Sequence, residues 1–525
     1  MTTKQHLFLS VGSLAILAGC KDTKTTKNPN IIFILADDMG YGDVSFLNEK
    51  SKIKTPNIDG IARNGVVFTN AHSSSSVSSP TRYGILTGRY NWRSTLKRGV
   101  LNGYSEALIP DERTTTASML KEQGYETACI GKWHLGWTWN NVEKGVDSVD
   151  FTQPITHGPT AVGFDCFYGI AASLDMPPYV YVENDTPTAL PDRITSGKGM
   201  QMWREGPTAS DFEHRTTLAH LIDKAVDYIN GRTAGKPFYL YLPLPAPHTP
   251  ILPGEMFQGK SGLNPYGDFV MEVDYMVGKI SEALRQNGIE DNTVLVFTTD
   301  NGCSPAAKIE ELQENGHYPN YIYRGHKADL YEGGHRIPCI VQWPARIKPH
   351  TVEHAVCLTD FMATFAALTG YPLKDNEAED SYDILPLLLD ISEQGTVREA
   401  VVHHSINGDF SLRSGDWKLL FSAGSGGWSY PRPGRDTTVI RTLPKIQLYN
   451  IRIDPGESCN VYAENIEVVN ELKEMMIRYI REGRSTPGIS QNNDGNEGWG
   501  ETLIQEWTRL CESGHLPPDA GKVKF

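Results

Sequence analysis

The sequence predicts an α/β protein with a large, mixed but mostly parallel sheet sandwiched by helices and a smaller C-terminal α+β subdomain carrying an antiparallel sheet. Through most of the chain, short apolar runs alternate with amphipathic segments, as buried strands and covering helices do. Beyond about residue 392, apolar and polar residues alternate between turn signals, which is typical of antiparallel strands. The 525 residues suffice for both units, which we place at 30–392 and 393–525.

The first 29 residues resemble a targeting segment and a tether. Lys4 precedes an apolar run, residues 7–19, that is shorter than the roughly 20 residues needed to span a bilayer. The run ends in "LAGC", which resembles the lipobox of bacterial lipoproteins. We therefore expect residues 1–19 to be a signal peptide, Cys20 to carry a lipid that holds the protein at a membrane, and residues 20–29 to be a polar tether. A plain signal peptide is the alternative.

The composition excludes one class of partner. The formal net charge is −14 and no block is rich in Lys and Arg, so we expect no nucleic acid to bind. Besides Cys20, seven cysteines are scattered without a C-x-x-C pair. Their odd number rules out a complete disulfide framework.

The expected elements follow one another in a regular alternation. Strands are expected at 30–38, 65–71, 126–134, 237–250 and 293–302, and helices at 54–65, from 82 onward, at 113–124, 218–232, 273–288 and 358–370. The smaller unit has expected strands within 400–406, 410–422 and 445–455 and a closing amphipathic helix at 465–483.

Polar residues follow four of the expected buried strands. In open α/β sheets, ligands bind beyond the carboxyl ends of the strands, so these residues predict one shared site. The clusters are Asp37 with Asp38, Lys132 with His134, His248, and Asp300 with Asn301.

The residue types in these clusters indicate a metal and an anion. The two acid-containing pairs form an all-oxygen set, which hard cations such as Ca²⁺ prefer. Taken singly, each pair could instead be a turn or a cap. Five cationic or titratable groups could together bind a tetrahedral oxyanion, although surface charges are the commoner use of Lys and Arg. They are Arg82, Lys132, His134, His248 and Lys327. Because residues two apart on a strand share a face, we expect Lys132 and His134 to point to the same side.

One further stretch carries a family resemblance. "SSPTRYGILTGR", residues 78–89, matches the sulfatase signature: Cys or Ser, x, Pro, x, Arg, then x-x-Leu-x-Thr-Gly-Arg. "NIIFILADDMGYGD", "GKWHLG", "PHTP", "TTDNG" and "GHKADLYEGGHRIP" match other blocks of the family in order. The chain is thereby identified, over roughly residues 30–480, as a relative of the sulfatases, whose fold is alkaline-phosphatase-like.

The resemblance implies that Ser78 is oxidised to formylglycine, with Pro80 and Arg82 read by the modifying enzyme. The hydrated aldehyde would supply the nucleophile, because a plain serine would be left as a stable sulfate ester. Ser rather than Cys at this position resembles the bacterial subset matured by a radical enzyme that does not need oxygen. It implies an exported lipoprotein of a Gram-negative anaerobe, in the periplasm or at the outer-membrane surface. The other serines, 73–76 and 79, do not fit the spacing, and we expect them to be loop filler.

The resemblance also implies the remaining roles. Arg82 would orient the modified residue, His134 would act on its hydroxyl during sulfate release, and His248 would protonate the leaving sugar oxygen. Lys132 and Lys327 would bind sulfate oxygens. The calcium ligands would be Asp37, Asp38, Asp300, Asn301 and the modified Ser78.

The implied substrate is a sulfated glycan from a host or an alga, with the sulfate on galactose or a hexosamine. Candidate sugar contacts lie in loops around the site: His157, Asp175, Arg324, His326 and His404. Two alternatives stay open. The fold is shared with phosphomonoester, phosphodiester and phosphonate hydrolases, and an unmodified Ser78 would leave a non-catalytic lipoprotein that binds sulfated glycans.

Overall fold

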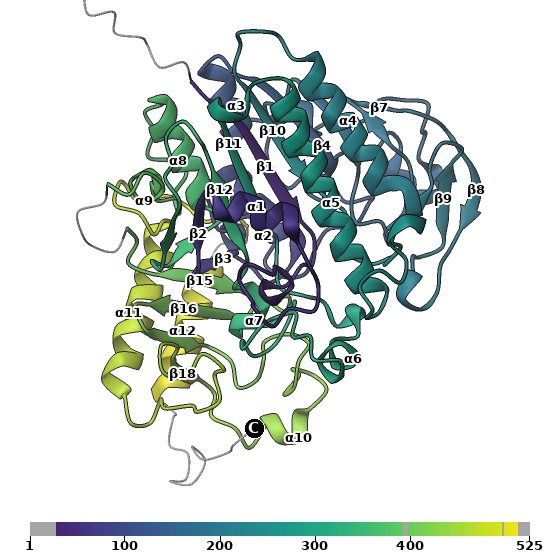
Figure 1. Cartoon of the computed structure of the whole chain (residues 1–525). Coiled ribbons are helices and arrows are strands. Elements are labelled where there is room, and N and C mark those ends of the chain that lie inside the picture. The colour runs from purple at the N-terminus through teal and green to yellow at the C-terminus, as the bar shows by residue number, and fades with distance from the viewer. Residues whose placement is uncertain (1–27, 392–396, 496–497, 513–525) are drawn as a thin grey trace, which may run out of the picture.

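The computed structural model describes residues 28–391, 397–495 and 498–512 (Figure 1). The predicted signal peptide, Cys20 and most of the predicted tether lie outside these residues, as does the predicted boundary between the two units at residue 392. None of the described helices combines the length and the apolar character that a bilayer crossing requires.

A ten-stranded sheet forms the centre of the large unit, in the order β13-β2-β12-β11-β1-β10-β4-β5-β6-β7. The five strands from β11 to β5 in this order run parallel, whereas β12 and β6 run antiparallel to their neighbours. The mostly parallel sheet predicted from the sequence is confirmed. Its strands are β1 (Asn30–Ala36), β2 (Val66–Phe68), β4 (Glu126–Lys132), β5 (Cys166–Ile170), β6 (Val182–Glu183), β7 (Thr186–Pro187), β10 (Phe238–Pro243), β11 (Thr293–Thr299), β12 (Cys339–Gln342) and β13 (His350–Val352).

The central strand β1 shows why this part of the sequence is a continuous apolar run. It lies between β10 and β11, pairing Ile31 with Tyr239 on one side and with Val294 on the other. Every residue of β1 is buried. A strand that is covered on both faces has no polar side to present, so alternation is lost.

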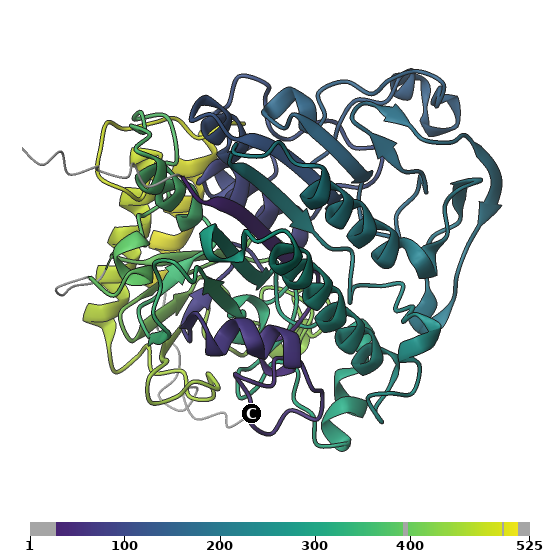
Figure 2. The same ribbon diagram turned by 45° about the horizontal axis from the view of Figure 1, so that its top comes forward.

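The long helices form two packed groups around the sheet (Figures 1 and 2). One group is α1 (Pro56–Arg63), α4 (Thr217–Gly231) and α5 (Pro265–Gln286); the other is α2 (Ser78–Thr87), α3 (Thr116–Glu122) and α8 (Asp360–Thr369). Phe361 of α8 meets Phe33 of β1 edge-on at 5.0 Å, which packs the second group directly on the sheet. The helices therefore hold the strand ends in a fixed arrangement.

The C-terminal part forms the predicted antiparallel sheet, with four strands in the order β15-β16-β17-β18. Its core is not separate from the large unit, because Tyr90 and Trp92, which follow α2, pack among its buried side chains. Trp92 meets Phe410 edge-on at 5.5 Å. The elements are β15 (Val401–His404), β16 (Phe410–Ser414), β17 (Trp417–Leu420), β18 (Gln447–Asn450), α11 (Ile466–Glu482) and α12 (Trp499–Glu512).

The remaining elements are short and connect the larger ones. They are β3 (Ala71–His72) paired with β14 (Val356–Cys357), the hairpin β8 (Pro191–Thr195) with β9 (Gly206–Ala209), and the helices α6 (Ile309–Glu314), α7 (Glu332–His335), α9 (Leu385–Leu388) and α10 (Thr437–Ile440). All five strands expected in the large unit are shorter than predicted; in particular, β10 ends at Pro243 and β4 ends at Lys132.

Candidate active site

The four predicted polar clusters meet at one edge of the sheet. Asp37 and Asp38 follow β1, Lys132 is the last residue of β4, and Asp300 follows β11. Strands β11, β1, β10 and β4 are consecutive in the sheet and parallel, so their carboxyl ends point to the same edge. The predicted convergence is confirmed by this topology.

Ser78 lies at the centre of this arrangement, as the first residue of α2. Its hydroxyl Oγ donates to Asp300 Oδ2 at 2.6 Å and lies 3.2 Å from Asp37 Oδ1. Lys132 Nζ is 3.3 Å from the same oxygen. The side chain is therefore surrounded by the carboxylates and an ammonium group that the sequence placed at the strand ends.

Three of the neighbouring serines do more than fill the loop, which the sequence did not predict. Ser73 Oγ donates to the carbonyl of Ser75 at 2.6 Å, and Ser75 Oγ donates to the carbonyl of His404 at 2.7 Å. Ser79 Oγ accepts from the backbone N–H of Leu101 at 3.1 Å. All three side chains are buried. A buried loop needs partners for its polar backbone, and these hydroxyls supply some of them.

Two cations neutralise the acids beside Ser78. Lys132 Nζ is 2.6 Å from Asp37 Oδ2, and Arg82 Nη2 is 3.0 Å from Asp300 Oδ2 and 3.4 Å from Asp37 Oδ1. Burial disfavours the charged form of Asp37, but Lys132, His248 and Arg82 outweigh it and hold the pKa of this carboxyl well below its ordinary value. The carboxylate is therefore ionised and able to bind a cation at neutral pH.

Lys327 adds a third cation, beside Asp38. Its Nζ is 2.7 and 2.8 Å from the two oxygens of Asp38. Burial disfavours its ammonium form, yet Asp38 and Asp37 raise the pKa of Lys327. Asn301 donates through Nδ2 to Asp38 Oδ1 at 2.7 Å, while its own Oδ1 is buried without a hydrogen-bond partner among the described residues.

His134 reaches the site for a different reason from the one predicted. Because β4 ends at Lys132, strand alternation does not place His134, whose backbone has a left-handed φ of 56°. Its Nε2 donates to the carbonyl of Leu101 at 2.8 Å, which leaves Nδ1 as a buried acceptor with no partner in the described part of the chain. Burial, with the neighbouring Lys132 and Arg82, lowers the pKa of His134 well below its usual range, so the ring is neutral.

His248 faces the acids from the loop after β10. Its Nδ1 donates to the carbonyl of Thr249 at 2.6 Å, and its Nε2 is 3.6 Å from Asp38 Oδ2. With Nδ1 occupied, Nε2 is the nitrogen that can exchange a proton with a ligand.

The donor set fits a hard divalent cation. Ligand atoms of Asp37, Asp38 and His248 lie within 4.8 Å of one another. Asp300 adds a third carboxylate through its bond to Ser78, and the free Oδ1 of Asn301 is an unused oxygen donor in the same cluster. Carboxylate and amide oxygens are the ligands that Ca²⁺ prefers.

The five candidate sugar contacts divide into four groups. Asp175 lies at the site, with Oδ1 3.9 Å from His248 Nδ1 and Oδ2 2.8 Å from Arg204. Arg324 and His326 line a separate hollow beside the site. His157 is exposed and pairs with Asp111 at 2.8 Å. The side chain of His404 is 1% exposed and leaves no surface for a sugar, which argues against that contact.

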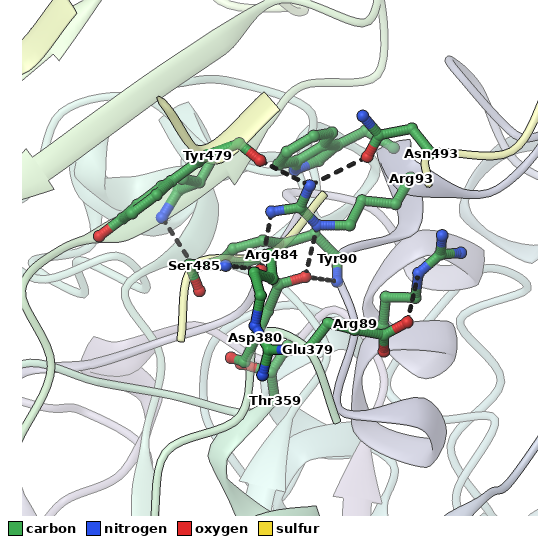
Figure 3. Close-up of polar contacts among 12 residues, drawn as sticks. Arg89, Tyr90, Arg93, Thr359, Glu379, Asp380, Tyr479, Arg484, Ser485 and Asn493 are labelled. Atoms are coloured by element: carbon green, nitrogen blue, oxygen red, sulfur yellow. Dashed lines mark hydrogen bonds and ion pairs between the residues drawn. The ribbon is translucent and has the colours of Figure 1, made fainter. Parts of the chain in front are cut away.

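Ion pairs that the sequence did not reveal anchor the far end of α2 (Figure 3). Arg93 binds both oxygens of Asp380 at 2.8 and 2.9 Å, and both side chains are fully buried. Arg89, the last residue of the quoted signature, pairs with Glu379 at 3.2 Å and with Asp494 at 2.7 Å. The partners lie roughly 290 to 400 positions away in the chain, so no local pattern could have pointed to them. They fix the helix that carries Ser78.

A second buried cluster also contains potential metal ligands: His72, Glu332, His335 and His403. Cations already occupy much of its hydrogen-bonding capacity. Lys418 Nζ is 3.1 Å from Glu332 Oε1 and 3.0 Å from His335 Nε2, and Arg413 Nη1 is 3.2 Å from His72 Nε2. This histidine cluster, as we call it, therefore joins the two units through an ion-pair network.

Comparisons with known proteins agree with this geometry. The Sulfatase family model matches residues 29–371. An N-acetylgalactosamine-6-O-sulfatase of Bacteroides thetaiotaomicron is 34% identical over 91% of this chain and 99% of its own, and human arylsulfatase A is 31% identical over 88% and 89%. A solved structure described under the metabolism of multiple glycosaminoglycans by B. thetaiotaomicron has a TM-score of 0.76 at 34% identity, covering 86% of this chain and 99% of its own.

Proposed function

Since this chain belongs to the sulfatase family, it is a sulfuric ester hydrolase that acts on sulfated carbohydrates, and we propose that it removes the 6-O-sulfate of N-acetylgalactosamine. The observation that carries the chemistry is the position of Ser78, whose hydroxyl lies among Asp37, Asp300 and Lys132. The choice of sugar rests on the 6-sulfatases among the relatives, bacterial and mammalian.

We infer that Ser78 is oxidised to formylglycine and that the four oxygen donors around it hold Ca²⁺. The hydrated aldehyde supplies a nucleophile that can be regenerated, and the metal ion supplies Lewis-acid stabilisation of developing negative charge. The donors are Asp37, Asp38, Asp300 and Asn301.

The chain's own cations are placed to bind the sulfate group. Lys132 pairs with Asp37 and Lys327 pairs with Asp38, so a sulfate bound beside these carboxylates would have two ammonium groups within reach. Arg82, fixed by Asp300 and by the carbonyl of Lys132 at 3.1 Å, holds the side chain of residue 78 in place.

Two histidines divide the proton transfers. His248 donates from Nε2 to the oxygen of the departing sugar, because Nδ1 is held by the carbonyl of Thr249 and Nε2 faces the acids of the site. His134 is neutral with a free Nδ1, so it accepts a proton from the hydroxyl of residue 78 during sulfate release. Asp175, beside His248, would contact a sugar hydroxyl.

Maturation and location follow from the same proposal. An oxygen-independent radical enzyme would oxidise Ser78 before export, and a lipid on Cys20 would hold the protein at the envelope of a Gram-negative anaerobe, in the periplasm or at the outer-membrane surface. The similarity to bacterial sulfatases supports a bacterial setting. Likeness to a phosphonate monoester hydrolase of Agrobacterium radiobacter, at 18% identity and a TM-score of 0.56, extends to the fold alone.

A panel of sulfated monosaccharides tests this function. We expect the native-host protein to release sulfate from N-acetylgalactosamine 6-sulfate faster than it releases sulfate from the 4-sulfate or phosphate from an aryl phosphate. Ser78→Ala should bind the 6-sulfate without turning it over. Faster phosphate than sulfate release, or equal release from both sulfate positions, would contradict the proposal.

A further inference from the structure

A hollow of about 1020 Å³ is lined by residues of α6 and of the loop that leads into α10. Figure 1 labels both helices. This volume is at the upper end for small-molecule sites, which usually enclose about 300 to 1,000 Å³. We call it the outer hollow. Its wall and floor include Tyr321, Arg324, His326, Trp428, Tyr430 and Arg432.

The floor of the outer hollow is built against the catalytic loops. The carbonyl of Pro319 accepts the N–H of Gly42, in the loop after Asp38, at 2.7 Å. Asn320 Oδ1 accepts the N–H of Cys303, two residues after Asn301, at 2.9 Å. The next residue beyond His326 is Lys327, whose ammonium group binds Asp38. A ligand in the hollow is therefore adjacent to the segments that hold the sulfate site.

One buried carboxylate fastens the wall to this floor. Asp329 accepts from the N–H of Trp428 at 2.7 Å and of Ser429 at 3.0 Å through Oδ1, and from the N–H of His326 at 2.9 Å through Oδ2. Gly427 lets the two loops approach closely, since a Cβ there would lie 2.2 Å from the carbonyl oxygen of Ala328. Trp428 is thus held at a fixed place relative to Lys327.

The surface of the outer hollow suits a carbohydrate. Trp428, Tyr430 and Tyr321 are 40%, 52% and 36% exposed, unusually open for large aromatic side chains. Tyr321 also has a left-handed φ of 57°, a conformation that bulky residues rarely adopt. Exposed aromatic faces can stack on the apolar face of a sugar ring. The acids of α6 can accept hydrogen bonds from its hydroxyl groups, and the arginines of the wall can donate to its anionic groups.

We propose that the outer hollow is a subsite for the neighbouring sugars of a sulfated oligosaccharide, with Trp428 and Tyr430 as its stacking surfaces. This proposal rests on the sulfatase function above and extends it from a single sulfated sugar to a chain. The hollow would increase activity on oligosaccharides over that on the monosaccharide, because binding energy gained away from the reacting ester can be used at it.

The test compares two substrates: N-acetylgalactosamine 6-sulfate and a tetrasaccharide that carries the same sulfated sugar. For Trp428→Ala we expect the ratio of kcat/KM for the tetrasaccharide to that for the monosaccharide to fall about tenfold, the loss typical of a buried aromatic anchor. Tyr318→Ala is the matched control, since Tyr318 is a nearby aromatic residue, 49% exposed, that does not line the hollow.

Calorimetry on the Ser78→Ala protein gives a readout that does not need turnover. Trp428→Ala in this background should weaken tetrasaccharide binding about tenfold. An unchanged ratio and unchanged affinity would overturn the subsite. Failure of the sulfatase function is distinguishable, because the wild-type protein would then release no sulfate from either substrate.

Discussion

Two buried clusters in this molecule combine acids, histidines and cations, yet their chemistry differs. The active-site cluster surrounds Ser78 at the ends of the parallel strands, and the histidine cluster lies where the C-terminal sheet meets the large unit. In the first, Asn301 Oδ1 and His134 Nδ1 are buried without partners in the described chain. In the second, Lys418 and Arg413 already bond the acid and two of the ring nitrogens.

The two clusters also differ in the balance between their acidic and cationic side chains. In the active-site cluster, three carboxylates face three cations, so calcium and a sulfate ester can be added together without a large excess of either sign: Asp37, Asp38 and Asp300 against Arg82, Lys132 and Lys327. In the histidine cluster, cations are already in excess: Lys418, Arg413 and Arg336 against Glu332 and Glu457. Unpartnered donor atoms alone do not separate the clusters, because both ring nitrogens of His403 also lack hydrogen-bond partners among the described residues. The difference teaches that balanced charge around oxygen donors, rather than the presence of ligand residue types, marks a site for a metal and an anion.

Replacing one carboxylate by an amide in each cluster tests the difference between the two clusters most sharply. We expect Asp300→Asn to lower kcat/KM by about 10² to 10³, because it removes a donor for the metal ion and the partner of Arg82. Glu332→Gln, in the histidine cluster, should leave kcat/KM of the folded protein within about threefold of wild type while lowering Tm. Steady-state kinetics and thermal unfolding measure both, and equal activity losses would remove the distinction.

Chelation separates the clusters by their ligand chemistry. EGTA should bring sulfate release to background and added Ca²⁺ should restore it, because carboxylate and amide oxygens gather around Ser78, whereas the carboxylates of the histidine cluster are paired with Lys418 and Arg413. The Glu332→Gln protein should show the same calcium dependence as wild type. Activity that persists after exhaustive chelation, with metal content checked by elemental analysis, would count against the calcium site.

Removing one cation from the histidine cluster should affect stability rather than chemistry. Lys418→Met leaves Glu332 and Glu457 without their shared ammonium partner, and we expect a loss of about 3 to 5 kcal/mol in the free energy of unfolding. The control is Lys279→Met, which breaks an exposed pair with Asp223 and should cost less than about 1 kcal/mol. Denaturant titration decides, and equal small losses would show that the network contributes little.

The histidine cluster should also make stability depend on pH. Burial lowers the pKa values of His72, His335 and His403 well below 6.5, with cations such as Lys418 adding to the effect. Below pH 6.5 the unfolded chain therefore binds protons that the folded chain does not, so stability falls as the pH falls.

His403→Phe keeps the ring that stacks on His335 at 3.5 Å and removes one such group. It should reduce the slope of stability against pH below 6.5 by up to about 1.4 kcal/mol per pH unit, the value for one proton. An unchanged slope in acid titrations monitored by denaturant unfolding would mean that His403 is protonated in the folded state.

The sequence predicted the active-site cluster better than its surroundings, for a physical reason. Asp37, Asp38 and Asp300 directly follow buried strands, and parallel strands bring their ends together whatever the loops do. His134 depends instead on a left-handed turn after β4, which alternation cannot foresee. The buried hydroxyl of Ser75 depends on the carbonyl of His404 as its partner, and His404 belongs to a strand of the C-terminal sheet.

Long-range pairs account for the rest of what was missed. Arg93 with Asp380 and His72 with His403 join segments hundreds of residues apart, and neither partner has a local pattern that names the other. The outer hollow also depends on a long-range contact. Asp329 accepts a hydrogen bond from the backbone of Trp428 and thereby brings Trp428 close to Lys327. Arg324 and His326 were selected as sugar contacts in loops around the site, whereas the aromatic residues of the same hollow were not.

The central claim is that Ser78 is not a serine in the working enzyme. Mass spectrometry of the peptide containing residue 78, from protein purified from its native host and active on N-acetylgalactosamine 6-sulfate, tests this most directly. We expect a mass lower by two hydrogens, with activity proportional to the modified fraction. Full activity in a preparation whose peptide retains an unmodified Ser78 would contradict the account.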